Sequence, residues 1–225
     1  MNDKIARTAG LLYLIVVVTG IFGLLYVPSQ IIVRGDALAT ANNILASESL
    51  YRLGIVIGLI SSTAFLLLPF ALYRLLEQVD RNVAALMVVL AVASVPISFV
   101  NLAHDLDALS LLSGADYLRA FTTDQLHALM YLSLKASGNG SLVSELFWGL
   151  WLLPFGYLVF KSGFLPRILG VLLMIGCFGY LTEVFGRILF PVGYAAVGIS
   201  NFIIIPSALG EVGTCLWLLI KGVRT

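Results

Sequence analysis

The sequence contains little charge. Asp, Glu, Lys and Arg make up 11% of its 225 residues and hydrophobic residues make up 60%, whereas charged residues are about 25% of a typical water-soluble domain. This composition excludes a water-soluble globular protein and indicates an integral membrane protein. The 13 basic and 12 acidic residues nearly cancel, and no basic footprint is present, so nucleic acid is not an expected partner.

Cysteine and histidine are also scarce. Cys177 and Cys215 lie inside long apolar runs and are best interpreted as small apolar core residues. They form neither a disulfide framework nor the spacing of a metal site. A bis-histidine haem site would need both His104 and His127, one at a helix end and one on a surface helix. No cofactor is therefore expected.

Six apolar stretches are long enough to cross a bilayer. They cover residues 5–27, 50–76, 82–102, 141–160, 164–189 and 200–220. Backbone amides in lipid must bond within their own segment, and none of these runs alternates as barrel strands do, so all six are expected to be helices. The sequence predicts an all-α membrane protein, a single polytopic domain over residues 1–225 built as a six-transmembrane-helix bundle.

The distribution of Lys and Arg predicts the orientation. Five cations lie on the long odd-numbered connections or the helix ends beside them, and eight lie at the termini and the two short connections: Lys4, Arg7, Arg74, Arg81, Lys161, Arg167, Lys221 and Arg224. The positive-inside rule then places both termini in the cytoplasm. A cleaved signal peptide is the competing interpretation of the first run. That run is too long, and the cleavage-like residues 37–39 lie too far beyond it, so we favour a retained helix.

Short interfacial helices are expected on the outer side. Residues 37–45 form one such helix after Asp36, and a second starts near Thr123 and Asp124, which can cap it. The second helix would either cover the mouth of the bundle as a lid or simply connect two spans along the lipid headgroups. Residues 138–141 are expected to form a flexible loop before the fourth span.

Carboxylates inside the apolar stretches are the main indication of function. Glu145, Glu183 and Glu211 lie in the last three stretches. A bare carboxylate in hydrocarbon costs several kcal/mol, so such groups are usually paired, protonated or exposed to a wet cavity. Arg187 lies four residues after Glu183 and can pair with it, and Arg52 could pair with Glu145. These pairs are either structural or part of a ligand site.

Glu211 has no cation at its depth in the membrane. It is therefore protonated, or it faces water or a bound cation, as in a proton or cation relay. All these polar groups lie between the midplane and the outer surface. The sequence predicts a polar pocket that opens outward and binds or moves a small solute, an ion or a lipid, as a transporter does. Membrane lipid is the other expected partner.

Two other functions stay open. His104 and Asp107 could join Glu145 around the metal of an intramembrane enzyme, although a wet helix end explains them equally well. A scaffold or sensor subunit without a ligand is the second alternative. No glycine-rich phosphate loop is present in the sequence.

One family resemblance covers nearly the whole chain. It is carried by residues 147–170 (FWGLWLLPFGYLVFKSGFLPRILG) and by shorter matches at residues 9–13, 43–52, 113–118 and 179–181. These segments resemble a family of bacterial membrane proteins, the domain of unknown function 4386, and the 161–170 turn is the most specific of them. The resemblance implies a multi-helix protein of the bacterial inner membrane. It implies no activity and no catalytic residue.

Overall fold

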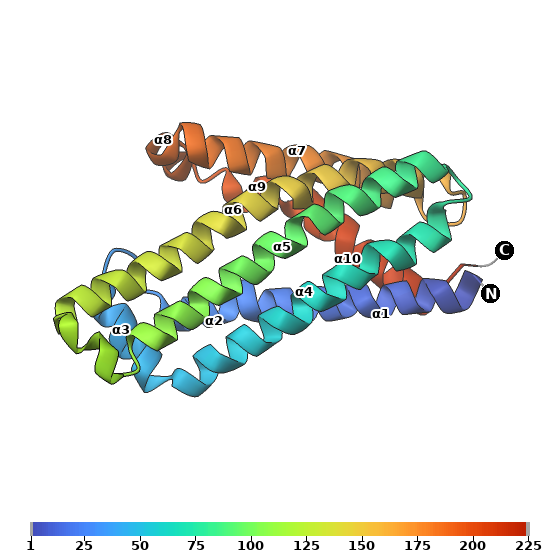
Figure 1. Cartoon of the computed structure of the whole chain (residues 1–225). Helices are drawn as coiled ribbons and strands as arrows, with labels where there is room; N and C mark the ends of the chain where they lie inside the picture. Colours follow the sequence, from blue (N-terminus) through green and yellow to red (C-terminus); the bar gives the residue numbers. More distant parts are fainter. Residues whose placement is uncertain (1, 224–225) are drawn as a thin grey trace. The chain divides into compact units, whose positions relative to one another are not determined.

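The computed structural model describes residues 2–223, apart from the side chains of residues 2, 195–197, 200 and 201. Arg224, which contributes to the predicted orientation, lies outside the described residues. Within this range the chain is helical, with turns and loops but no strand (Figure 1). The helical elements are α1 (Asn2–Gly20), the π-helix η1 (Ile21–Tyr26), α2 (Val27–Ile31), α3 (Ala37–Ala46), α4 (Glu48–Leu76), α5 (Arg81–Leu111), the 3-10 helix η2 (Asp116–Ala120), α6 (Thr123–Lys161), α7 (Arg167–Leu189), α8 (Pro191–Val197), α9 (Ser200–Ile203) and α10 (Ile205–Ile220).

Five helical segments are long and apolar enough to cross a membrane. They are Asp3–Ile31, Glu48–Leu76, Arg81–Leu111, Thr123–Lys161 and Arg167–Leu189. The predicted all-α membrane class is thus supported, while a sixth complete crossing is not confirmed. The first segment runs from α1 through η1 into α2 without leaving helical geometry.

The chain divides into two compact units. The first unit contains Met1–Val17, Ala64–Pro96 and Leu142–Thr225, and the second contains Val18–Thr63 and Ile97–Ser141. The helical segment that begins with α1 and the helices α4, α5 and α6 each contribute residues to both units.

Aromatic side chains form the centre of the first unit. Trp151 stacks on Phe155 with ring centroids 5.1 Å apart, and Phe65 meets Trp151 edge-on at 5.4 Å. Helices α7 and α10 lie side by side in this unit (Figure 1). Glycines allow α6 and α7 to touch, because a Cβ at Gly156 would lie 2.6 Å from the Gly170 carbonyl oxygen. This close packing brings polar groups of different helices together.

The second unit has its own apolar core and a capped short helix. Its buried residues are Val27, Ile31, Ala41, Ile44, Tyr51, Ile55, Ala108, Met130 and Leu134. The predicted short helix after Asp36 is present as α3, and the Asp36 side chain caps it by accepting from the Ala39 amide at 2.8 Å. The Gly35 amide donates to the Tyr131 hydroxyl at 2.7 Å and ties the preceding loop to α6.

The predicted loop at residues 138–141 is wrong. Helix α6 continues through it, so the residues expected to form a separate surface helix are the first part of α6. The Asn101 amide of α5 contacts both Gly140 and Ser141, and small residues at such contacts let membrane helices approach closely. Glycine and serine residues that would indicate a loop in a water-soluble protein mark a contact between helices in this membrane protein.

The capping residue of α6 lies one position before the predicted one. The Gln125 amide donates to Thr122 Oγ1 at 3.3 Å, and the Thr122 amide donates to Gln125 Oε1 at 2.9 Å. This reciprocal pattern is a capping box. The cap is therefore Thr122 rather than the predicted Thr123 and Asp124.

The last predicted span is interrupted. Helix α9 ends at Ile203 and α10 begins at Ile205, because Pro206 has no amide hydrogen to donate to the preceding turn. The Ser207 hydroxyl donates to the Ile204 carbonyl at 2.7 Å in this break. The 16 residues of α10 extend about 24 Å at 1.5 Å per residue, less than the roughly 30 Å of a hydrocarbon core.

Candidate functional site

Charged side chains of the first unit meet around Arg187 on α7. Arg187 Nη1 lies 3.8 Å from Glu183 Oε1, so the predicted same-helix pair is present. The same nitrogen lies 3.6 Å from Glu145 Oε1 of α6. One guanidinium thus serves two carboxylates. The Glu145 and Glu183 side chains are 20% and 13% exposed, while that of Arg187 is 46% exposed.

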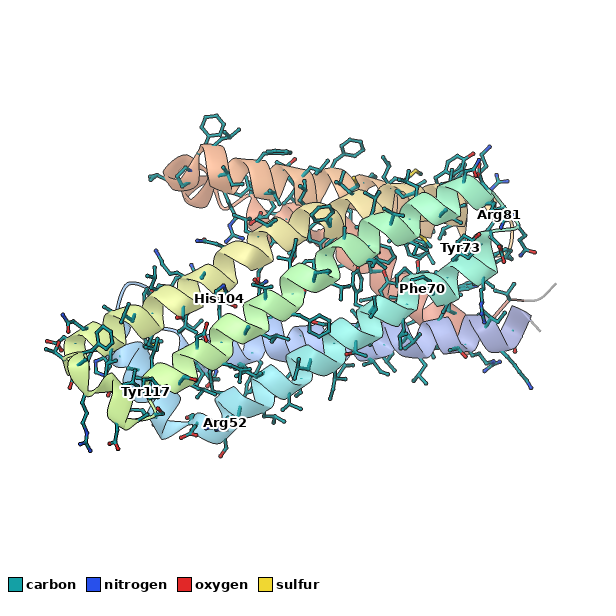
Figure 2. The ribbon with its side chains drawn as sticks, viewed as in Figure 1. Arg52, Phe70, Tyr73, Arg81, His104 and Tyr117 are labelled. Atoms are coloured by element: carbon teal, nitrogen blue, oxygen red, sulfur yellow. The ribbon has the colours of Figure 1, made fainter. Side chains whose placement is uncertain are left out.

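The predicted pairing of Glu145 with Arg52 is replaced by two other pairs. Glu145 pairs with Arg187, and Arg52 Nε bonds Glu48 Oε1 at 2.6 Å in the second unit (Figure 2). Glu48 lies four residues before Arg52 on the same helical face, which makes it the nearer partner. Arg52 therefore falls outside the candidate site.

A tyrosine from the short helix α8 completes the surroundings of Glu183. The Tyr194 hydroxyl donates to Glu183 Oε2 at 2.8 Å. Gly186 on α7 lies directly against the Tyr194 ring, so a side chain at this position would displace the ring. Both Glu183 oxygens thus have a contact, one with a guanidinium and one with a phenol.

Glu145 has a buried oxygen without a partner. Its Oε2 atom and the neighbouring Ser144 hydroxyl form no hydrogen bond with any residue in the described part of the chain. A buried acceptor left unsatisfied costs about 1 to 3 kcal/mol, and native structures contain few such atoms. A proton or a bound cation at this oxygen would remove that cost.

Glu211 of α10 lies among hydroxyl groups from three helices. Tyr13 of α1 and Tyr180 of α7 both interact with its carboxylate. Tyr13 is fully buried, and its hydroxyl faces the Glu211 carboxylate. Ser207, one turn before Glu211, lies beside the Tyr180 hydroxyl. In the same range no Lys or Arg nitrogen lies within 4 Å of Glu211.

Tyr180 connects the two groups of carboxylates, since it interacts with both Glu211 and Glu145. Close contact of α7 with α10 makes this possible, because Gly176 lies against Ser207 with no room for a side chain. We call the whole set the acidic cluster: Glu145, Glu183, Glu211 and Arg187 with Tyr13, Tyr180, Tyr194 and Ser207. It contains three carboxylates and one guanidinium.

The sequence analysis misses the tyrosines of this cluster. Tyr180 lies three residues before Glu183, a spacing that places both on one helical face and could have identified it. Tyr13 and Tyr194 come from other elements, and no spacing rule links them to the carboxylates. Their contribution depends on how the helices pack.

The proposed metal ligands form a small exposed pair in the second unit. His104 Nδ1 lies 3.5 Å from Asp107 Oδ2, and the two side chains are 37% and 63% exposed (Figure 2). Across the described residues, no three His, Cys, Asp or Glu side chains converge as they would around a metal ion. Cys177 and Cys215 are buried, and the Cys215 thiol donates to the Gly10 carbonyl at 3.5 Å.

Comparison with known proteins identifies the family. The family model described as "Domain of unknown function (DUF4386)" matches residues 8–222. The chain belongs to this family. The match to the DUF4386 family includes every residue of the acidic cluster and confirms the resemblance carried by residues 147–170.

One curated relative is an uncharacterized protein of Archaeoglobus fulgidus. It is 30% identical over 155 residues, which are 68% of this chain and 73% of the relative. No solved structure matches the chain. The DUF4386 family brings no assigned activity, so a functional argument has to start from the geometry of the acidic cluster.

Proposed function

We propose that this DUF4386 protein binds a proton or a small cation at the acidic cluster and moves it within the membrane. One observation carries the proposal: Glu145 and Glu183 share the Arg187 guanidinium, and the Glu145 Oε2 atom is buried with no hydrogen-bond partner among the described residues. Glu211, the third carboxylate, has no Lys or Arg nitrogen within 4 Å in the same part of the chain. With all four groups ionised, two negative charges are in surplus. Such a surplus in a low-dielectric region attracts a cation and repels an anion.

The oxygen atoms around Glu211 suit a hard cation or a proton relay. Tyr13, Tyr180 and Ser207 surround this carboxylate with hydroxyl groups, and oxygen is the ligand that such cations prefer. Hydroxyl groups also exchange protons with a neighbouring carboxylate.

The break between α9 and α10 supports movement as well as binding. Discontinuous helices beside buried charged groups are a recurring feature of transporters, where they coordinate ions near the midplane. Ser207 bonds the Ile204 carbonyl in the break and also lies beside Tyr180 of the acidic cluster. In this proposal α9 and α10 together complete a sixth crossing.

The protein is proposed to lie in the bacterial cytoplasmic membrane with both termini inside. The Lys and Arg distribution supports this orientation, and it places the acidic cluster in the outer half of the bilayer. A reporter fused to the C-terminus should behave as cytoplasmic, and an epitope inserted at Gly114 should be accessible from outside. A periplasmic C-terminus would contradict both the orientation and the six crossings.

Thermal unfolding in detergent tests the site. The wild-type melting temperature should rise with Na⁺, Li⁺ or K⁺, or should change between about pH 5 and 8, because a species that binds the folded state stabilises it. Glu211→Gln keeps the shape of the side chain and should abolish this response. Glu48→Gln, which removes a carboxylate from the second unit, is the matched control and should respond as the wild type does.

A wild-type melting temperature that does not change with pH or with any of the three cations would contradict the proposal. So would a Glu211→Gln variant that responds as strongly as the wild type. In either case the acidic cluster would be a structural feature of the helix packing.

A further inference from the structure

The turn between α6 and α7 has a defined structure but no part in the acidic cluster. The Ser162 hydroxyl donates to the Val159 carbonyl at 2.8 Å and accepts from the Leu165 amide at 3.2 Å. Gly163 has φ +75°, a conformation that other residues rarely adopt. These features hold the turn in one shape. It is also the segment that the sequence singled out as the most specific part of the family resemblance.

An open hollow lies beside this turn, within the first unit. Its lining is mainly polar and comes from the end of α6, the turn after it and the turn between α4 and α5: Gln78, Val79, Tyr157, Lys161, Ser162 and Phe164. We call it the turn hollow. Lys161 is the charged residue of the lining, so the hollow has a positive charge and no negative one.

Two donors of the turn hollow have no partner in the described part of the chain. Within residues 2–223, the Lys161 ammonium forms no ion pair and the Tyr157 hydroxyl forms no hydrogen bond. Gln78 differs, because its side-chain nitrogen already donates to the Leu75 carbonyl at 3.2 Å. Lys161 and Tyr157 are therefore the groups available to an incoming ligand.

Two arginines of the first unit add positive charge, which Glu77 beside Arg81 partly offsets. Arg81 Nε donates to the Tyr73 hydroxyl at 3.3 Å (Figure 2), and the Arg167 guanidinium lies 5.7 Å from the Phe160 ring centroid. Neither forms an ion pair with a described carboxylate. Asp80 is occupied, since it accepts the Asn82 and Val83 amides at the start of α5.

We propose that the turn hollow binds the phosphate group of an anionic lipid, with the Lys161 ammonium and the Tyr157 hydroxyl as donors. Lys161 is the last residue of a membrane-crossing helix, which places it at headgroup level. Basic pockets between helices on the cytoplasmic side are a known setting for anionic headgroups. A tyrosine with an apolar ring and a polar tip suits the same level. The site is independent of the acidic cluster, whose charge has the opposite sign.

Lipid binding to the purified full-length protein tests this proposal. Native mass spectrometry would compare dioleoyl phosphatidylglycerol with dioleoyl phosphatidylcholine for the wild type and for Lys161→Gln, Tyr157→Phe and Lys135→Gln. Lys135 is an exposed lysine on the same helix but in the second unit, which makes it the matched control. We expect Lys161→Gln to weaken phosphatidylglycerol binding roughly fivefold, the effect of about one interfacial cation. Tyr157→Phe should weaken it less, and Lys135→Gln should leave it unchanged.

Several results would overturn the proposal. Equal binding of the two lipids would show that the net charge of the lipid has no effect. Equal losses in Lys161→Gln and Lys135→Gln would show general surface attraction rather than a site. If Tyr157→Phe bound phosphatidylglycerol as tightly as the wild type does, the Tyr157 hydroxyl would not be a donor. The geometry proposed for the turn hollow would then be wrong. Competition with inorganic phosphate distinguishes a lipid from a soluble ligand. If inorganic phosphate displaces phosphatidylglycerol at equal concentration, the turn hollow binds a soluble phosphate compound instead of a lipid.

Discussion

Two exposed carboxylates of the second unit differ from two buried carboxylates of the first unit in how they are paired. In the second unit, Glu48 has Arg52 at 2.6 Å and Asp116 has Arg119 at 2.8 Å, and each pair is well exposed. In the first unit, Glu145 and Glu183 share Arg187 at 3.6 and 3.8 Å and are largely buried. Exposed one-to-one pairs contribute about 0 to 1 kcal/mol and need no further explanation. Buried carboxylates that outnumber their cations do need one, and the proposed binding of a proton or cation would supply it.

The largest expected contrast lies along α6, which contributes residues to both units. Gly156→Ala would place a methyl group 2.6 Å from the Gly170 carbonyl oxygen and 2.9 Å from the Met174 amide nitrogen, so the helices must separate. We expect a loss of about 3 kcal/mol, at the upper end for overpacking. At Gly138 nothing lies within 4 Å of an added Cβ, and Gly138→Ala should be neutral or slightly stabilising.

Denaturant titration of both variants in the same detergent measures this contrast. Equal stability of Gly156→Ala and Gly138→Ala would contradict the close approach of α6 and α7. It would also contradict the contact between Arg187 on α7 and Glu145 on α6.

The next contrast compares the two arginines. Arg187→Gln removes the cation that two buried carboxylates share, and we expect a loss of about 2 kcal/mol. This is less than the roughly 3 to 5 kcal/mol for breaking a fully buried pair, because the Arg187 side chain is 46% exposed. Arg52→Gln should cost less than about 1 kcal/mol.

A double-mutant cycle sharpens this comparison. Adding Glu183→Gln to Arg187→Gln removes one of the carboxylates left unpaired, so the double variant should be more stable than the sum of the single losses predicts. Strict additivity of the two losses in thermal unfolding would show that Glu183 and Arg187 do not interact.

The smallest contrast concerns two tyrosines of the acidic cluster. Tyr194→Phe removes the hydrogen bond to Glu183 Oε2 and should cost about 1 kcal/mol. The Tyr13 hydroxyl faces the Glu211 carboxylate, so Tyr13→Phe should reduce the response to cations or pH with little change in stability. A destabilised Tyr13→Phe with an unaltered response would remove Tyr13 from the proposed site.

Long apolar runs predict the helical membrane class, and local spacing predicts the Glu183 and Arg187 pair. Both depend on residues that are close in the sequence. The continuity of α6 through residues 138–141 could not be predicted, because Gly140 and Ser141 are helical through their contact with Asn101 on another helix. The break before α10 could have been predicted from the sequence, because Pro206 cannot donate a backbone hydrogen bond.

The candidate site also combines features that can be predicted from the sequence with features that depend on helix packing. Glu145, Glu183, Arg187 and Glu211 stand out as charged residues in apolar runs. The sharing of Arg187 between two helices depends on tertiary packing, and so do the positions of the tyrosines. That sharing changes the interpretation from two separate ion pairs to one cluster with excess negative charge.

Flux through reconstituted vesicles tests the central claim most directly. Purified protein in liposomes, with either a pH-sensitive or a cation-sensitive dye inside and an imposed proton, Na⁺, Li⁺ or K⁺ gradient, would report proton or cation movement. The account predicts movement by the wild type and by Arg52→Gln, and a loss of at least about tenfold in Glu211→Gln, which lacks the ionisable group that binds the moving species. Wild-type vesicles that move neither protons nor any of these cations, or a Glu211→Gln variant as active as the wild type, would contradict it.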